Sequence, residues 1–189
     1  AQELSLLGST VITLGRTKLN KKNHIKCSIK NEKEIKDALK KIKKNFGKID
    51  VLINVAGISE SVKESKNLQK ISDFQMILDT NLVGIYKVCN IAKNYLKKGS
   101  SIINVTSIAS QFGFPNNPGY ISSKSGLSGL TRSLAYDLSD FRMDNNKFLT
   151  FVYSFFLPMK YIICGEEHAL KDKFKLSLIR DLANFFNLL

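Results

Sequence analysis

The sequence IDVLINVAG, residues 49–57, decides the fold, because it is a run of β-forming apolar residues that ends in small ones. Gly47 precedes this run and ends an amphipathic pattern over residues 32–46, as glycine commonly ends a helix. Residues 102–105, IINV, form a second continuous apolar run of the kind buried on both faces of a parallel sheet. This alternation of helical and strand patterns predicts an α/β domain.

Further strands and helices are predicted on either side of that run. Two short β-branched runs, 10–14 and 24–29, come before it. Two long helical patterns come after it: 72–96, with Ser72 as the expected N-cap, and 119–138. Because parallel strands need long crossover connections, we predict a Rossmann-like α/β fold, a doubly wound parallel sheet with helices on both faces.

Composition and charge fit one soluble domain, since 43% of the 189 residues are hydrophobic and 24% are charged. The formal net charge of +13 raises the question of nucleic-acid binding. However, the lysines between residues 18 and 48 recur along the predicted helix 32–46, and no aromatic residues interleave with them to stack on bases. We interpret them as a solvated helix face and expect no nucleic-acid partner.

The cysteines and the start of the chain bear on its compartment. Cys27, Cys89 and Cys164 are few and widely separated, so they indicate neither a disulfide framework nor a zinc cluster. They favour a reducing compartment, and we expect a cytoplasmic protein. The chain begins at Ala1 with no signal-peptide pattern and reads as the interior of a longer protein, which leaves an organelle open.

The most apolar stretch, residues 148–165, was considered as a membrane anchor. Pro158 and Lys160 interrupt it well before the ~20 apolar residues that a spanning helix needs. We expect a buried strand or a disordered segment here and no membrane span.

Polar side chains follow the two strongest strands. Ligands of such sheets bind at the carboxyl ends of the strands. Residues 54–57, with small Ala56 and Gly57, follow the first strand, and Ser107 follows the second. Tyr120 and Lys124 are four residues apart on the last predicted helix, so they share a face.

Together these segments resemble the short-chain dehydrogenase/reductase family. Residues 54–57, NVAG, resemble its Asn-Asn-Ala-Gly motif, and residues 104–107, NVTS, resemble the strand that ends in its active-site serine. Residues 120–124, YISSK, match Tyr-x-x-x-Lys, and residues 80–84 resemble the helix segment with its fourth catalytic residue. Each fragment alone has an ordinary structural explanation, whereas the shared order and spacing identify the family.

The resemblance implies four catalytic residues: Ser107, Tyr120, Lys124 and Asn81. A free phenol has a pKa of ~10, so acid and base catalysis near neutrality needs a neighbour that favours the phenolate. The ammonium of Lys124 acts in that direction and, in the family, also holds the nicotinamide ribose. Ser107 would hydrogen-bond the substrate oxygen, and Asn81 would hold a water that relays protons.

The residue after the first strand indicates which cofactor is used. Gly15 and Arg16 stand where NAD-dependent relatives usually carry an acid, and a guanidinium suits a 2′-phosphate. We therefore favour NADP(H) over NAD(H), against the alternative that Arg16 is a solvated loop charge. Ser28 stands where many members have an adenine-contacting Asp. The full set of predicted cofactor-binding residues is Arg16, Ser28, Ile29, Asn54, Ala56, Gly57, Tyr120 and Lys124.

Both ends of the sequence depart from the family pattern. The family's Gly-rich phosphate turn is not recognisable, and residues 2–7 resemble the end of the helix that follows it. After residue 140 we recognise neither the next strand nor the Pro-Gly turn that covers the nicotinamide. We divide the chain into a partial Rossmann-like domain, 1–141, and a divergent tail, 142–189, produced by a frame shift or an exon boundary near Phe141.

Two functions follow from these observations. One is an NADP(H)-dependent carbonyl or 3-oxoacyl reductase, represented by an incomplete chain and acting on a small-molecule or acyl-carrier-bound carbonyl substrate. The other is a catalytically inactive remnant that keeps the family's oligomerisation helices, 72–96 and 119–138. By resemblance, a complete fold would form a homodimer or homotetramer.

Overall fold

Short strands alternate with helices along the chain, as the sequence predicted. In this computed structural model the described residues are 1–59, 68–139, 147–151 and 161–164. In chain order, the elements are α1 (Gln2–Leu6), β1 (Thr13–Gly15), β2 (His24–Lys26), α2 (Glu32–Phe46), β3 (Ile49–Asn54), α3 (Ile71–Leu78), η1 (Asp79–Val83), α4 (Gly84–Ala92), β4 (Leu96–Val105), η2 (Ile108–Ser110), α5 (Pro118–Ser139), β5 (Lys147–Phe151) and β6 (Tyr161–Cys164). Of these, η1 is a π-helical turn and η2 is a 3-10 turn.

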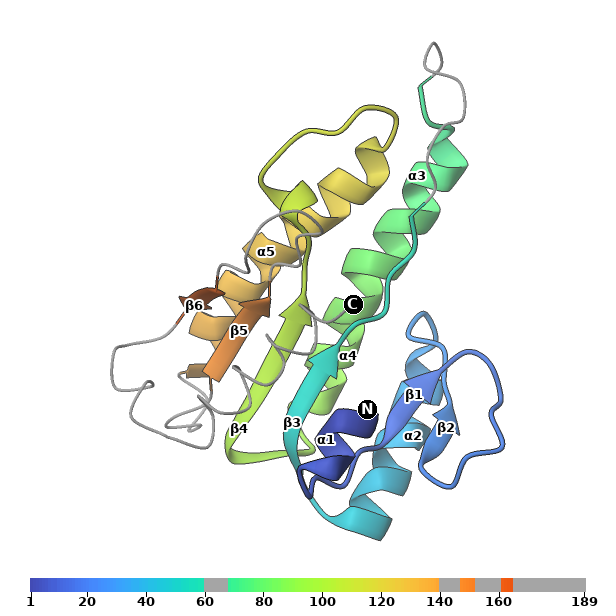
Figure 1. Cartoon of the computed structure of the whole chain (residues 1–189), viewed down its shortest axis with the longest axis vertical. Helices are drawn as coiled ribbons and strands as arrows, with labels where there is room; N and C mark the ends of the chain where they lie inside the picture. Colours follow the sequence, from blue (N-terminus) through green and yellow to red (C-terminus); the bar gives the residue numbers. More distant parts are fainter. Residues whose placement is uncertain (60–67, 140–146, 152–160, 165–189) are drawn as a thin grey trace.

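The strands form two sheets. β1 pairs in parallel with β2 in the first, and the second has the order β3-β4-β5-β6, parallel except for β6. Among the described residues no strand pairing joins β1 to β3. In Figure 1, β3 and β4 lie side by side and point the same way, so their carboxyl ends at Asn54 and Val105 meet at one edge. Ligand sites of parallel sheets form at such an edge.

The sheet continues past residue 140, where we did not recognise the strand that the family carries next. Residues 147–151 form β5, which pairs with residues 101–105 of β4. KFLTF is rich in β-forming residues, which explains the strand without a recognisable turn before it. For the apolar stretch 148–165, the strand interpretation holds for residues 148–151 and 161–164. The expected frame shift near Phe141 stays a prediction, because that residue lies outside the described ones.

Helices α2, α4 and α5 pack on one face of the sheets, because Leu52 of β3 contacts both of the hydrophobic clusters that they form. Figure 1 shows α4 and α5 behind β3 and β4. The cluster between α2 and α4 contains Cys27, Ile35, Ala38, Leu39, Ile42, Val88, Ile91 and Ala92, and that between α4, α5 and β4 contains Ile85, Cys89, Leu96, Ile102, Leu127, Leu134 and Leu138.

None of the described helices is long and apolar enough to cross a membrane.

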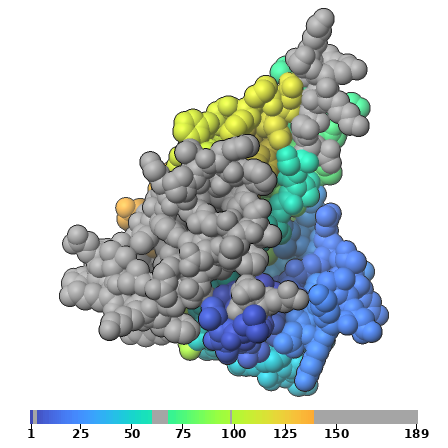
Figure 2. Space-filling model, viewed as in Figure 1, coloured from blue at the N-terminus to red at the C-terminus, as the bar shows by residue number. Residues whose placement is uncertain are grey.

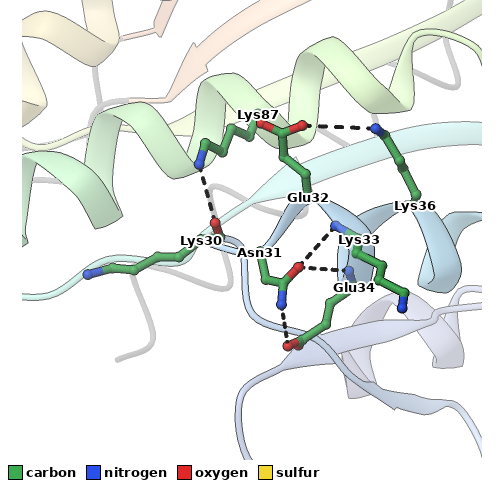
Figure 3. A network of polar contacts seen from close by, with 7 residues as sticks. All are labelled: Lys30, Asn31, Glu32, Lys33, Glu34, Lys36 and Lys87. Atoms are coloured by element: carbon green, nitrogen blue, oxygen red, sulfur yellow. Dashed lines mark hydrogen bonds and ion pairs between the residues drawn. The ribbon is translucent and has the colours of Figure 1, made fainter.

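Helix α2 begins and ends where the sequence predicted, and Asn31 explains its start. Asn31 Oδ1 accepts hydrogen bonds from the backbone N–H groups of Lys33 (3.0 Å) and Glu34 (3.3 Å), as an N-cap does. Asn31 Nδ2 donates to Glu34 Oε1 at 3.0 Å. Lys87 of α4 donates to the backbone oxygen of Lys30 at 3.3 Å, so this start is also tied to the neighbouring helix (Figure 3).

The basic residues of the N-terminal segment, residues 16–48, lie on the protein surface. Every lysine and arginine between residues 16 and 48 is exposed. Glu32 and Lys36 form an ion pair of 3.9 Å, in which both side chains are more than half exposed (Figure 3). The surface of the N-terminal segment forms the blue area of Figure 2. These exposures agree with our interpretation of a solvated helix face.

The long helix predicted over residues 72–96 consists of three joined pieces. Ser72 lies inside the first turn of α3, so the prediction that it is the N-cap is wrong; Lys70 holds that position without a side-chain bond. The π-helical turn η1 carries Asn81, which faces the protein interior with 0% exposure. Leu96 already belongs to β4, because its Cα is the partner of a β3 residue. The periodic apolar pattern therefore continued past the true end of the helix.

Candidate active site

Lys124 of α5 is buried, which is rare for lysine, with 4% of its surface exposed. Its Nζ donates a hydrogen bond to the backbone oxygen of Val105 at the end of β4, 2.8 Å away. Burial lowers the pKa of Lys124 to about 8, because the charged amine loses solvation there. The centroid of the Tyr120 ring lies 5.7 Å from the same Nζ. The amine and the phenol predicted to act together are therefore neighbours at the carboxyl edge of the sheet.

Ser107 begins the turn that follows β4. Its Oγ accepts a hydrogen bond from the N–H of Ala109 at 3.2 Å, and the residue is 9% exposed. The turn is joined to α5 by a hydrogen bond from Ser125 Oγ to the backbone oxygen of Ser110 at 3.2 Å. Because Lys124 and Ser125 bond to residues on either side of Ser107, the serine lies beside the helix that carries Tyr120.

Asn81 connects the loop after β3 with α5. Its Oδ1 accepts the N–H of Ile58 at 2.8 Å, and its Nδ2 donates to the Ile58 oxygen at 2.8 Å and to Ser123 Oγ at 3.0 Å. Ser123 Oγ in turn donates to the backbone oxygen of Tyr120 at 2.7 Å. Both side-chain hydrogens of Asn81 are used within the protein, so its amide acts here as a clamp between the two segments.

Gly57 completes the convergence of these segments. A Cβ at Gly57 would lie 3.5 Å from Asn81 Oδ1 and 3.6 Å from Lys124 Nζ. Ala56 and Gly57 are exposed, so small residues leave the backbone of this loop open beside the buried amine. The structure thus places Gly57 between Asn81 and Lys124, with the Tyr120 ring beside Lys124 and Ser107 in the turn that follows β4.

Asn54 lies inside the sheet. Its Nδ2 donates to Asn104 Oδ1 at 2.8 Å and to Cys89 Sγ at 3.4 Å, and Asn104 Nδ2 donates to Thr131 Oγ1 at 3.0 Å. Thr131 donates onward to the Leu127 oxygen at 2.7 Å. Burial raises the pKa of the Cys89 thiol to about 12. The hydrogen bonds that start at Asn54 therefore join β3, β4, α4 and α5, and both side-chain hydrogens of Asn54 are used inside the protein.

The residues predicted to bind the adenine side of the cofactor, Arg16, Ser28 and Ile29, lie in three different environments. Arg16 is exposed directly after β1. The backbone N–H of Ser28 donates to Glu34 Oε2 at 2.8 Å. Ile29 packs into the core against α4, where a Cβ at Gly84 would lie 2.9 Å from its Cδ1. Ile29 therefore acts as a packing residue in the described part of the chain.

Sequence reasoning missed three polar links around Tyr120: Ser123, Gln69 and the pair of Asn117 with Ser59. Gln69 Oε1 accepts the N–H of Gly119 at 2.9 Å, and Asn117 Nδ2 donates to Ser59 Oγ at 2.8 Å. Ser123 stood within the quoted YISSK, and its position one residue before Lys124 was the available signal. A single Gln or Asn in a loop carries no such signal, because the partner of Gln69 is 50 residues away in sequence and the partner of Asn117 is 58 residues away.

The sequence of this chain matches a known family. A family model described as enoyl-(acyl carrier protein) reductase matches residues 10–146. The 3beta-hydroxysteroid dehydrogenase of Mediterraneibacter gnavus is 32% identical over 144 residues, which cover 69% of this chain and 52% of that protein. The chain belongs to the short-chain dehydrogenase/reductase family, and it spans about half the length of the curated relative.

Solved structures show the same fold. The ligand-free aldohexose dehydrogenase of Thermoplasma acidophilum matches with a TM-score of 0.70 and 28% identity, over 81% of this chain and 60% of that one. ElxO with NADP bound matches with a TM-score of 0.57 and 33% identity, over 62% and 48% of the respective chains. The predicted doubly wound Rossmann-like class is thereby confirmed.

Proposed function

We propose that the chain carries the catalytic centre of an NAD(P)(H)-dependent oxidoreductase that interconverts a carbonyl group and a secondary alcohol. The observation that carries this proposal is the buried amine of Lys124, bonded to the Val105 oxygen and adjacent to the Tyr120 ring. Burial of an amine costs free energy, and side chains with strongly shifted pKa values in such positions are commonly functional. A single hydrogen bond to one carbonyl oxygen would not by itself require a lysine.

Tyr120 is the proposed general acid and base. In reduction its phenol donates a proton to the substrate oxygen, and in oxidation its phenolate takes the proton from the alcohol. An ammonium next to a phenol favours the phenolate. Because burial lowers the pKa of Lys124 to about 8, its amine carries this positive charge only below about pH 8. The support that the charge gives to oxidation should therefore weaken as the pH rises beyond that value.

Ser107 and Asn81 have different proposed tasks. Ser107 Oγ already accepts the Ala109 N–H, and within the described residues its own hydrogen has no acceptor, so it can donate to the substrate oxygen. Asn81 holds the loop after β3 against α5 through Ile58 and Ser123. A proton-relaying water at Asn81 would have to use the remaining acceptor positions of that residue.

A nicotinamide cofactor supplies the hydride in this class of reaction. The open backbone at Ala56 and Gly57, next to Lys124 Nζ, suits a group that must approach the chain closely. The exposed guanidinium of Arg16 after β1 suits a 2′-phosphate, which supports NADP(H) over NAD(H). The substrate is proposed only by class, as a small-molecule or acyl-carrier-bound carbonyl compound.

Binding and turnover test the proposal separately. NADPH fluorescence is titrated with the chain, and its oxidation is followed by absorbance with a panel of ketones and 3-oxoacyl thioesters. Tyr120→Phe should keep NADPH binding but lose at least ~100-fold in rate, because the proton donor is gone. Retention of the wild-type rate by Tyr120→Phe would refute the assignment.

The alternative of an inactive remnant with retained oligomerisation helices has one observation in its favour. Met76, Val83 and Tyr86, on the consecutive segments α3, η1 and α4, are each more than a third exposed, and Tyr136 of α5 is 75% exposed. Apolar groups exposed along neighbouring helices suit a second copy of the chain. A dimer by light scattering, together with absent NADPH binding, would favour this alternative over the enzyme.

A further inference from the structure

The first turn of α5, which carries Tyr120, is held at its N-terminus by a residue far away in the sequence. Pro118 has no N–H, and the N–H of Gly119 donates to Gln69 Oε1 at 2.9 Å. The first helical bond after it runs from the Ile121 N–H to the Asn117 oxygen at 3.2 Å. Gln69 thus serves the helix start in the way that an N-cap side chain normally does.

Gln69 is built into the protein and is not a surface side chain. It is 7% exposed and lies directly before α3. A Cβ at Gly119 would lie 2.7 Å from Gln69 Oε1 and 3.2 Å from the backbone Cα of Phe74, so a glycine lets the start of α5 contact α3 directly. The hydrogen bond therefore joins two helix starts that are packed against each other.

We propose that Gln69 is a positioning residue for Tyr120, and this inference rests on the proposed function. The Nζ of Lys124 donates a hydrogen bond to the backbone oxygen of Val105 at 2.8 Å, which holds the amine at the end of β4. Tyr120 stands one turn nearer the helix start, immediately after the N–H that Gln69 holds. Gln69 keeps the first turn helical and so keeps the phenol beside the amine.

Two substitutions test whether the side-chain acceptor of Gln69 holds the start of α5. Gln69→Ala removes the acceptor, whereas Gln69→Glu keeps an acceptor oxygen and adds a charge that a helix N-terminus favours. Gln75→Ala on α3 is the matched control, because Gln75 is exposed and donates to Asp79 at 2.8 Å, away from Gly119. All three variants are made in the full chain.

The first measurement is hydrogen exchange of the backbone amides in the peptide that covers the start of α5. Gln69→Ala should exchange ~tenfold faster in this peptide, which is the effect of losing a cap worth about 1.4 kcal/mol. Gln69→Glu and Gln75→Ala should exchange as the wild type does. Unchanged exchange in Gln69→Ala overturns the inference, whether or not the chain is active.

The second measurement is the steady-state rate of alcohol oxidation. Gln69→Ala should lower kcat ~tenfold with little change in the KM for NADP(H), because the phenol moves away from the reacting atoms while the cofactor site stays intact. Gln69→Glu should keep the wild-type kcat. Faster exchange without a loss of kcat would leave Gln69 as a helix cap alone and overturn the positioning role. An inactive wild-type chain refutes the proposed function and with it the role toward Tyr120, while the exchange result alone still decides whether Gln69 holds the helix start.

Discussion

Substitution of Lys124 by methionine should make the folded chain more stable at neutral pH, although it removes the proposed catalytic amine. Methionine has a similar length and no charge to desolvate. In the wild type the ammonium is buried, with 4% of the residue exposed, and its pKa falls from 10.5 to about 8. The folded chain at pH 7 therefore carries a charge that would be better solvated in the unfolded chain.

The size of this stability difference follows from the pKa of Lys124 in the folded and unfolded chain. A lowering from 10.5 to about 8 corresponds to about 3 kcal/mol of lost stability wherever both states are protonated, which is below about pH 8. Between about pH 8 and 10.5 the unfolded state keeps the proton that the folded state has released, so stability rises with pH and the penalty disappears. The hydrogen bond to the Val105 oxygen, worth about 1 kcal/mol, is lost in the variant at every pH. Lys124→Met should thus be more stable by about 2 kcal/mol near pH 7, and this advantage should vanish near pH 10.

Urea unfolding followed by far-UV circular dichroism, repeated between about pH 6 and 10, measures the difference. All other titrating groups are common to both proteins and cancel in the comparison. Lys40→Met, at an exposed position on α2, is the control and should show a difference that does not change with pH. If the stability difference for Lys124→Met also stays constant within about 0.5 kcal/mol, the buried amine does not ionise as described.

Three further substitutions test other parts of the structure. Asn104→Ala should lower the free energy of unfolding by about 3 kcal/mol, because it removes one buried hydrogen bond from Asn54, one from Thr131 and the packing of the side chain; urea unfolding measures this, and a loss below about 1 kcal/mol would contradict the network. Asn31→Ala should cost about 1 kcal/mol through loss of the α2 cap, which the same assay detects, while Asn31→Ser, which keeps a capping oxygen, should be close to neutral. Arg16→Ala should weaken NADPH binding ~tenfold and leave NADH binding unchanged, as fluorescence titration would show; equal losses for both cofactors would exclude a contact with the 2′-phosphate.

Local patterns predicted the helices and strands well where a clear physical signal marked their ends. Helix α2 has its predicted bounds because a run of lysines, an apolar stripe and Gly47 all agree. The pattern over residues 72–96 failed at both ends and concealed a π-helical turn, because apolar spacing alone does not show where backbone hydrogen bonds change. Strand β5 was expected only as one of two alternatives for residues 148–165, because its partner, β4, is more than 40 residues earlier in the sequence and no local turn marks it.

The catalytic candidates could be named from sequence for two reasons. Strand ends and a shared helix face predicted that Ser107, Tyr120 and Lys124 lie at the carboxyl edge of the sheet, and the resemblance to the family implied their roles. The burial of Lys124, its bond to Val105 and its lowered pKa could not be foreseen, because they depend on the atoms that surround the amine after packing. Tertiary structure alone also decided that Asn54 faces the sheet interior and that Gln69 holds the start of α5, since a hydrogen bond between distant residues exists only once the chain has brought them together.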